Sequence, residues 1–190
     1  MKYKLKNKEI ELTDEEVKEI VKQNSEPKEE KKIGLEIKNR FTGEVIFTST
    51  KITYKEAVEE AVSQNADLRN ADLENAYLEN ADLENAYLEN TNLWDANLRN
   101  VNLRNVNLRD ANLWNADLRN AYLWDANLRN ANLRNVNLRD ADLRKANLRN
   151  VNLENADLEN AKFYGRGGTI KLTKAQVPVF LKALGFLIED

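Results

Sequence analysis

The 190-residue chain contains no cysteine and no histidine, and it has only six glycines and two prolines. The missing cysteine and histidine exclude disulfides, zinc sites built on these residues, and nucleophiles that need a cysteine or a serine–histidine pair. No long apolar run is present, and the first 25 residues are charged throughout. We therefore expect neither a signal peptide nor a membrane span, and a cytoplasmic location. The 29 Lys and Arg residues are nearly balanced by 32 Asp and Glu residues, which leaves no bulk basic charge for nucleic acid.

Five-residue units dominate the chain. Twenty of them follow one another without a break from Ala66 to Gly165. Their third position is Leu in nineteen units, from Leu68 to Leu158 in steps of five, and Phe163 in the last unit. The first position is Ala in 15 units, and polar or aromatic residues fill almost all of the remaining positions.

A period of five fits neither an α-helix nor a flat strand. In a helix each step of five residues turns roughly 500°, so the leucines would face every direction. In a flat strand successive leucines would point to opposite faces. Only a backbone that turns a corner in every unit keeps all the large side chains inside, and Asn and Asp tolerate the left-handed conformations of such corners. The period predicts an all-β solenoid, but it fixes neither the number of sides nor the handedness.

The tandem A-[D/N]-L-x-x units resemble the pentapeptide-repeat family over 100 of the 190 residues. The resemblance implies a right-handed quadrilateral β-helix with four units in each coil, and hence five coils over residues 66–165. It also implies an interior filled by the Leu and Ala positions. Small α/β caps are expected at both ends, because uncovered β-helix edges invite polymerisation.

Residues 33–65 read as the N-terminal cap, which we expect to run directly into the first repeat. Two short strands are predicted around a turn at Gly43. A helix should follow, because Thr53 and Glu56 have the spacing of a capping box ahead of an apolar face.

Residues 166–190 predict a second cap, made of a strand and a helix. The helix carries too many apolar side chains for a solvated tail. We expect these to cover the last coil, a second copy of the chain, or both, so that the protein is a monomer or a homodimer through its terminal segments. The candidate cap or dimer contacts are Phe180, Leu181, Leu184, Phe186 and Leu187.

Residues 1–24 predict a small strand–helix appendage, and residues 25–32 a polar linker. The appendage is too short to fold alone. Segment 10–17 matches segment 170–177 at every apolar and capping position. Either a common β–α pattern has arisen twice by chance, or the appendage docks at a specific place on its own body or on a partner.

The fourth position of each unit is expected to face outward. If one coil has twenty residues, side chains twenty apart stack in columns, so that Trp94 precedes Trp114 on one side and arginines stack on another. Outward tryptophans are favoured at interfaces. The candidate interaction surface consists of Trp94, Trp114, Trp124, Arg99, Arg119, Arg139 and Arg134.

Both features have a structural alternative. Nearby carboxylates such as Asp110, Asp140 and Asp142 can neutralise the arginines locally, or an anionic partner can lie along the rod. The tryptophans can stack on one another with a cation above them, for stability alone, or they can bind a partner. The sequence leaves these alternatives open.

Catalysis finds little support in the sequence. The outward Asp and Glu residues are expected on convex, solvated sides without a pocket, and scattered aspartates make no metal cage. We therefore expect no enzyme activity, no cofactor and no metal. The favoured function is a non-enzymatic scaffold or protein-interaction module with a protein partner. Direct nucleic-acid binding by charge and stacking is a second class, and the interspersed carboxylates count against it.

The resemblance also implies an alternative function, in which the chain imitates duplex DNA and modulates a type II topoisomerase. Duplex DNA carries a charge about every 1.7 Å, or roughly fourteen charges over the height of five coils. The five successive twenty-residue segments from residue 66 carry −5, 0, −1, +3 and −1. This distribution resembles DNA poorly, so the alternative ranks second.

Overall fold

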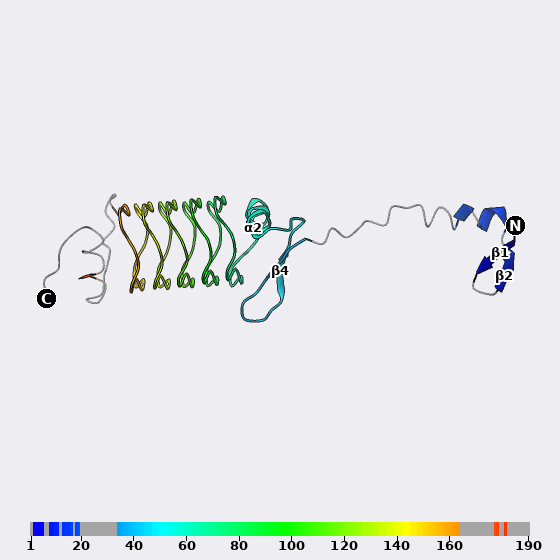
Figure 1. Cartoon of the computed structure of the whole chain (residues 1–190), viewed down its shortest axis with the longest axis horizontal. Helices are drawn as coiled ribbons and strands as arrows, with labels where there is room; N and C mark the ends of the chain where they lie inside the picture. Colours follow the sequence, from blue (N-terminus) through cyan, green and yellow to red (C-terminus); the bar gives the residue numbers. More distant parts are fainter. Residues whose placement is uncertain are drawn as a thin grey trace. The chain divides into compact units, whose positions relative to one another are not determined.

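The computed structural model describes residues 2–5, 8–11, 13–16, 18–19, 34–163, 177–178 and 181. The chain divides into two compact units, Met1–Lys32 and Ile33–Asp190 (Figure 1). The division falls at the end of the predicted linker, and each unit is described by itself.

The N-terminal unit contains an antiparallel hairpin. Strand β1 (Lys2–Leu5) pairs with strand β2 (Lys8–Glu11), with Tyr3 opposite Ile10. The sequence predicted one strand before the helix, whereas the structure has two. The alternation of lysines with Tyr3 and Leu5 was the available signal for the first strand.

Helical residues follow the hairpin at 14–16 and 18–19. The Glu16 amide donates to the Thr13 hydroxyl at 3.3 Å, and the Glu16 carboxylate accepts from the Thr13 amide at 2.8 Å. This reciprocal pair is a capping box, at the capping positions that segment 10–17 shares with segment 170–177.

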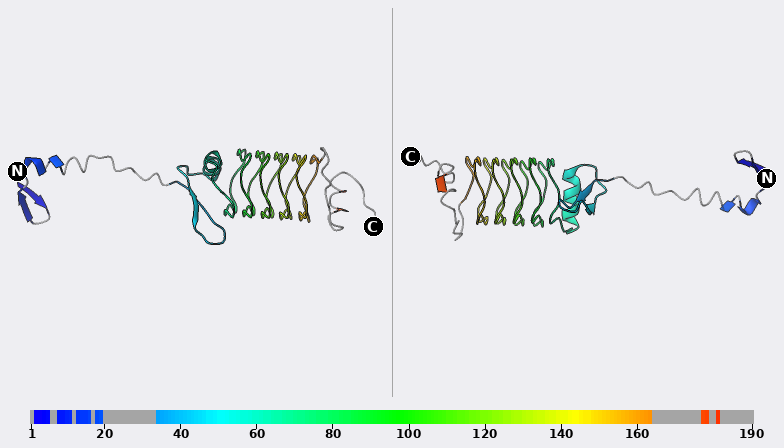
Figure 2. Two further views of the ribbon diagram at one scale, coloured as in Figure 1. Left: turned by 180° about the vertical axis from the view of Figure 1, so that it is seen from behind. Right: turned by 90° about the horizontal axis from the view of Figure 1, so that it is seen from below.

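The repeats form stacked turns of backbone, which both orientations in Figure 2 show from the side. Parallel bridges join residues that are twenty apart, from the pair Asp72 and Asn92 to the pair Asp142 and Lys162. The Leu73 amide, for example, donates to the Asn92 carbonyl at 2.8 Å. One coil therefore contains four five-residue units, in agreement with the four-sided path implied by the resemblance.

The fifth position of each unit forms the corner. From Asn70 to Asn160 every fifth residue has a backbone φ between 55° and 63°. Asn and Asp occupy these corners because they enter the left-handed region at a lower cost than other non-glycine residues. Lys145, with φ of 62°, is the exception within this stretch.

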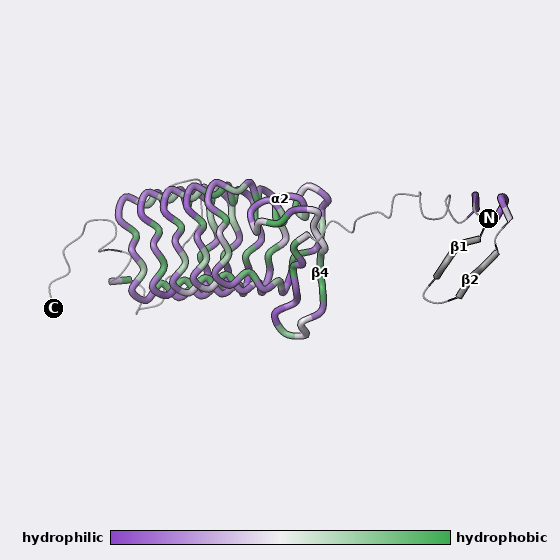
Figure 3. Tube along the Cα trace, turned by 45° about the vertical axis from the view of Figure 1, so that its right-hand side comes forward, coloured by the Kyte–Doolittle hydropathy of each residue, from purple (hydrophilic) through white to green (hydrophobic). Residues whose placement is uncertain are grey.

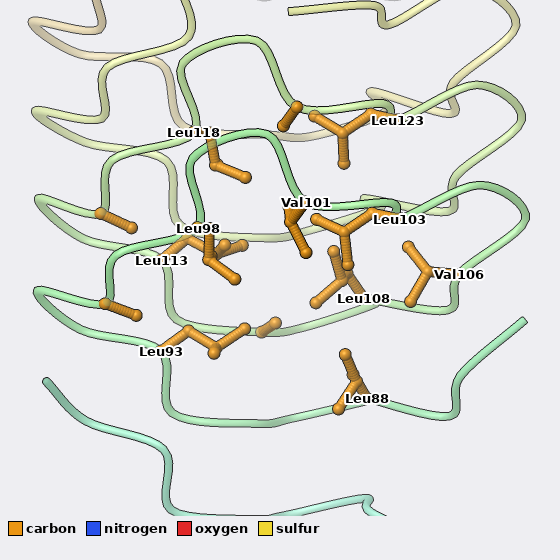
Figure 4. Packing of buried hydrophobic residues seen from close by; sticks show 14 of the residues in the cluster. Leu88, Leu93, Leu98, Val101, Leu103, Val106, Leu108, Leu113, Leu118 and Leu123 are labelled. Carbon is orange, nitrogen blue, oxygen red and sulfur yellow. The ribbon is translucent and has the colours of Figure 1, made fainter. Parts of the chain in front are cut away.

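The interior of the coils is a continuous apolar column. The third-position leucines from Leu68 to Leu158 are at most 3% exposed. Figure 4 shows Leu93, Leu98 and Leu103 pointing into the space enclosed by the backbone. Along the tube in Figure 3, hydrophobic positions recur between hydrophilic ones in every turn, because each unit sends two small or branched apolar side chains inward and its polar ones outward.

The N-terminal cap precedes the coils. Strands β3 (Glu36–Lys38) and β4 (Val45–Thr48) are antiparallel, with Ile37 opposite Phe47, and helix α2 (Tyr54–Ser63) follows. Gly43 in the connecting loop has φ of 72°. The Glu56 amide donates to the side chain of Thr53 at 3.3 Å, which caps α2 as the sequence predicted.

The cap supplies partners for the edge of the first coil. In later coils the second-position amide donates to the coil before it, and the first coil has no such neighbour. Instead, the Lys38 carbonyl accepts from the Asp72 amide at 2.7 Å, and the Glu59 carboxylate of α2 accepts from the Asp82 amide at 2.9 Å. The cap thus occupies backbone groups through which an exposed edge would pair with another chain.

The predicted C-terminal cap falls mostly outside the described residues. Positions 177, 178 and 181 are helical, and Leu181 is half-buried. The roles of the other candidate contacts remain predictions, since four of them lie outside the described residues: Phe180, Leu184, Phe186 and Leu187. Among the residues that the structure describes, no helix combines the length and the hydropathy needed to cross a bilayer.

A central leucine should dominate the stability of the coils. Leu108 is completely buried, so Leu108→Ala removes buried apolar surface and leaves a cavity. We expect a loss of about 3 kcal/mol in the free energy of unfolding, measured by guanidinium titration. The exposed Arg129→Ala is the control and should cost about 0.5 kcal/mol or less. A loss below about 1 kcal/mol for Leu108→Ala would mean that the side chain is not buried.

Candidate interaction surfaces

Each coil has four sides, which we name A to D. A side consists of the second, fourth and fifth positions of units that lie twenty residues apart. The fourth positions are Arg69, Glu89, Arg109, Arg129 and Arg149 on side A; Glu74, Trp94, Trp114, Arg134 and Glu154 on side B; Glu79, Arg99, Arg119, Arg139 and Glu159 on side C; and Glu84, Arg104, Trp124 and Arg144 on side D. The predicted candidate residues therefore lie on three different sides.

Side B brings two tryptophans together. The ring centroids of Trp94 and Trp114 are 5.0 Å apart at an interplanar angle of 78°, an edge-to-face arrangement. Trp94 is 38% exposed. With Asn112 and Asn132 the two rings line a shallow hollow of about 260 Å³. The sequence predicted that these tryptophans stack, but it did not predict the hollow.

A ladder of amide side chains holds this surface in place. The Nδ2 group of Asn112 donates to Asn92 Oδ1 at 3.1 Å, and that of Asn132 donates to Asn112 Oδ1 at 3.0 Å. The same Oδ1 atoms accept from the backbone amides of Trp94 at 3.4 Å and Trp114 at 3.3 Å. Hydrogen bonds between the asparagine side chains of adjacent coils thus hold the backbone that carries the two tryptophans.

Aspartate at the second position pairs with arginine two residues later. The Arg119 guanidinium contacts the Asp117 carboxylate at 2.5 Å, and that of Arg144 contacts Asp142 at 2.5 Å. The hydrogen bond from Arg144 lowers the pKa of the Asp142 carboxyl. Burial raises the pKa of the Asp117 carboxyl, but the hydrogen bonds and charge of Arg119 more than offset this, so that the net shift is downward.

The arginine column of side C is largely compensated. Arg139 pairs with Asp157 at 3.4 Å and also with Glu159. Arg119 is paired as described above, and Arg99 keeps a buried Nε with no hydrogen-bond partner among the described residues. On side B, Arg134 contacts Glu154 at 3.0 Å. These contacts favour local neutralisation of the predicted arginines over a role in binding an anion.

Side D places cations over its aromatic rings. The Lys145 ammonium lies 4.3 Å from the ring centroid of Trp124, and the Arg104 guanidinium lies 5.3 Å from that of Tyr122. Among the described residues no cation lies over Trp94 or Trp114. Trp124 therefore fits the alternative in which a cation over the ring stabilises the fold. Trp94 and Trp114 on side B instead line an accessible hollow.

A second hollow of about 390 Å³ lies where sides C and D meet, lined by Asn120, Ala121, Tyr122, Asp140, Asp142, Asn160 and Lys162. The sequence did not predict it, because its walls come from three coils. Over the described ranges of the chain, no three acidic side chains lie together in a way that could hold a metal ion.

Side A also carries stacked arginines, and they are not among the predicted candidate residues. Arg129 and Arg149 are exposed, and neither has an acidic partner among the described residues. The signal was available, because Asn127 and Asn147 occupy the second positions where the paired arginines have aspartate.

Comparisons with known proteins agree with this architecture. A sequence profile described as pentapeptide repeats matches the chain in eight copies, over residues 66–105, 86–125, 96–135 and 126–165. Together these ranges cover more than half of the 190 residues. No curated protein matches the chain.

Several solved structures are similar to parts of this chain. A pentapeptide repeat protein, Rfr23, from the cyanobacterium Cyanothece 51142 is 39% identical over 52% of this chain, with a TM-score of 0.46; the match spans 65% of that protein's length. HetL from Nostoc sp. strain PCC 7120, a pentapeptide repeat protein involved in heterocyst differentiation regulation, is 26% identical over 56% of this chain and 67% of its own, with a TM-score of 0.34. QnrB1, a plasmid-mediated fluoroquinolone resistance protein, is 18% identical over 64% of this chain and 84% of its own, with a TM-score of 0.28.

The aspartate–arginine pairs should make stability depend on acid pH. A carboxyl whose pKa is lowered by folding contributes stability above its unfolded pKa of about 3.9 and loses that contribution as the pH falls through the folded value. The free energy of unfolding should be nearly constant from about pH 8 to about pH 5 and decline below about pH 4. Asp142→Asn should flatten this decline, and Asp125→Asn, at a position with no arginine partner among the described residues, should not. Equal pH profiles for the two variants would contradict this account.

Proposed function

Because this chain belongs to the pentapeptide-repeat family, we propose that its repeats act as a non-enzymatic protein-interaction module in the cytoplasm. Members of the family are generally structural or interaction modules. The proposal treats residues 66–165 as five coils of a right-handed quadrilateral β-helix that carries no cofactor. The observation that carries it is the exposed Trp94–Trp114 pair on side B.

Two physical properties suit side B to binding. Tryptophan supplies a large contact area and is enriched among the residues that dominate interface energies. The amide ladder under Trp94 and Trp114 is already ordered, so a partner would not have to order this backbone and the entropic penalty of binding is small. A side chain of the partner can enter the hollow between the rings and the amides of Asn112 and Asn132.

Imitation of DNA, directed at a type II topoisomerase, is the alternative function. It requires at least one strongly acidic side. Side B is the most acidic, with Asp72, Glu74, Asp95 and Glu154 against Arg134. Its net charge of −3 compares with roughly fourteen phosphate charges on a duplex of the same height. The charge distribution therefore favours the interaction module.

The Trp94 and Trp114 side chains should be required for partner capture. Immobilised full-length chain is incubated with extract from its source cells, and retained proteins are quantified by mass spectrometry. The variant Trp94→Ala/Trp114→Ala should lose at least one retained protein by about tenfold or more, as expected for a tryptophan hot spot. Tyr77→Ala is the matched control, because Tyr77 is an exposed aromatic residue on side C, and it should retain the same proteins as the unmodified chain.

Two outcomes would count against the proposal. Identical sets of retained proteins for the double tryptophan variant and the Tyr77 control would show that side B is not the interface. A supercoiling assay with DNA gyrase tests the alternative: the interaction module should leave supercoiling unchanged at micromolar concentrations, and strong inhibition would favour DNA mimicry.

A further inference from the structure

Side A carries two arginines, Arg129 and Arg149, that have no acidic partner among the residues that the structure describes. Arg129 and Arg149 stack one coil apart, as shown by the hydrogen bond from the Asn130 amide to the Arg149 carbonyl at 2.9 Å. The next arginine on this side, Arg109, contacts Asp110 at 3.2 Å and Glu89 at 3.7 Å. Among the described residues, Arg109 therefore has acidic partners, whereas the two arginines that follow it on side A, Arg129 and Arg149, have none.

Arg129 and Arg149 differ from the paired arginines, such as Arg119, in the charge of the second-position side chain and not in the backbone conformation of the unit. Asn127 Oδ1 and Asn147 Oδ1 accept from the backbone amides of Arg129 at 3.3 Å and Arg149 at 3.2 Å. Asp117 Oδ1 accepts in the same way from the Arg119 amide at 3.2 Å. Asparagine therefore builds the same turn as aspartate, but it leaves the guanidinium without an internal carboxylate.

Amide side chains flank the two arginines on both sides, and each row of amides ends on a carboxylate of side A: Asn107 Nδ2 donates to Glu89 at 2.6 Å, and Asn130 Nδ2 donates to Asp110 at 2.8 Å. In the second positions, Asn127 Nδ2 donates to Asn107 at 3.0 Å and Asn147 Nδ2 donates to Asn127 at 3.3 Å. In the corner positions, Asn150 Nδ2 donates to Asn130 at 3.1 Å. We call this surface the side A strip: Asn127, Arg129, Asn130, Asn147, Arg149 and Asn150. Two guanidinium groups attached about 4.8 Å apart repel each other, and nothing within the strip offsets that repulsion.

We propose that the side A strip binds an extended, acidic polypeptide segment. The guanidinium fork matches a carboxylate with two parallel hydrogen bonds. One extended segment lying along the column can place successive Asp or Glu side chains against Arg129 and Arg149, while the flanking amides face its backbone. This surface is separate from the tryptophan hollow of side B.

The width and charge of the strip favour a polypeptide over nucleic acid. A duplex spans several sides of the coil and gains affinity from about six to ten phosphate contacts, whereas the strip offers two arginines. Single-stranded nucleic acid needs aromatic platforms for its bases, and the second positions beside Arg129 and Arg149 are asparagines. A single extended peptide needs neither many cationic contacts nor aromatic platforms.

Peptide binding by charge-matched variants tests the proposal. Full-length chain is titrated at low salt into a fluorescein-labelled peptide of alternating Glu and Ser, and the dissociation constant is measured by fluorescence anisotropy. Asn147→Asp gives Arg149 the partner that Asp117 gives Arg119, so the dissociation constant should rise about tenfold although both arginines remain. Asn137→Asp adds the same charge before Arg139 on side C and should change the constant by less than about twofold. Arg129→Ala/Arg149→Ala should weaken binding at least as much as Asn147→Asp.

Thermal unfolding of each variant checks that the fold is retained, and the double arginine variant decides the matter if Asn147→Asp is destabilised. Equal effects of Asn147→Asp and Asn137→Asp on the dissociation constant would overturn the proposal, since they would show that binding depends only on the net charge of the protein. Absence of binding by the unmodified chain would also overturn it. So would tighter binding of a thymidine oligonucleotide than of the Glu-Ser peptide, or equal binding of a Gln-Ser peptide.

Discussion

The left-handed corner at every fifth residue is the constraint on which the whole repeat domain depends. Positive φ from Asn70 to Asn160 turns the backbone once in each unit, and four such turns bring a residue over the one twenty positions earlier. The leucines then all face inward. Every outward side chain acquires fixed neighbours at twenty-residue spacing, so the composition of each side can be read directly from the sequence.

Within this frame the second position decides what each side presents. Aspartate there binds the arginine two residues later and removes its charge from the surface, as Asp117 and Asp142 do. Asparagine accepts the same backbone hydrogen bond but provides no carboxylate for the arginine, as Asn127 does before Arg129. One scaffold thus carries an aromatic hollow on side B, ion pairs on side C, and two arginines on side A, Arg129 and Arg149, that have no acidic partner among the described residues.

The elements set by periodicity were predictable from the sequence. The buried leucines, the contact between Trp94 and Trp114 in one column and the cap of α2 at Thr53 all follow from spacing and residue type, whereas the edge-to-face angle of the two rings does not. The placement of Lys145 over Trp124 was not predictable, because side-chain torsions bring a corner residue over a ring in the preceding coil. The pairing of Arg144 with Asp142 and of Arg109 with Asp110 agrees with the local neutralisation that the sequence offered as one alternative. The cap expected over the last coil from residues 166–190 lies mostly outside the described residues and stays a prediction.

Disulfide formation between introduced cysteines tests the twenty-residue coil most directly. The chain has no cysteine of its own, so each pair can be assayed without background. Asn112 and Asn132 are bridged neighbours on adjacent coils, at about the 4.8 Å spacing that lies within the range a disulfide spans. Asn112→Cys/Asn132→Cys should therefore oxidise completely within one chain, and pairs spaced by fifteen or twenty-five residues, Asn112→Cys/Asn127→Cys and Asn112→Cys/Asn137→Cys, should stay reduced. Preferential oxidation of either of the latter pairs would contradict a coil of four units.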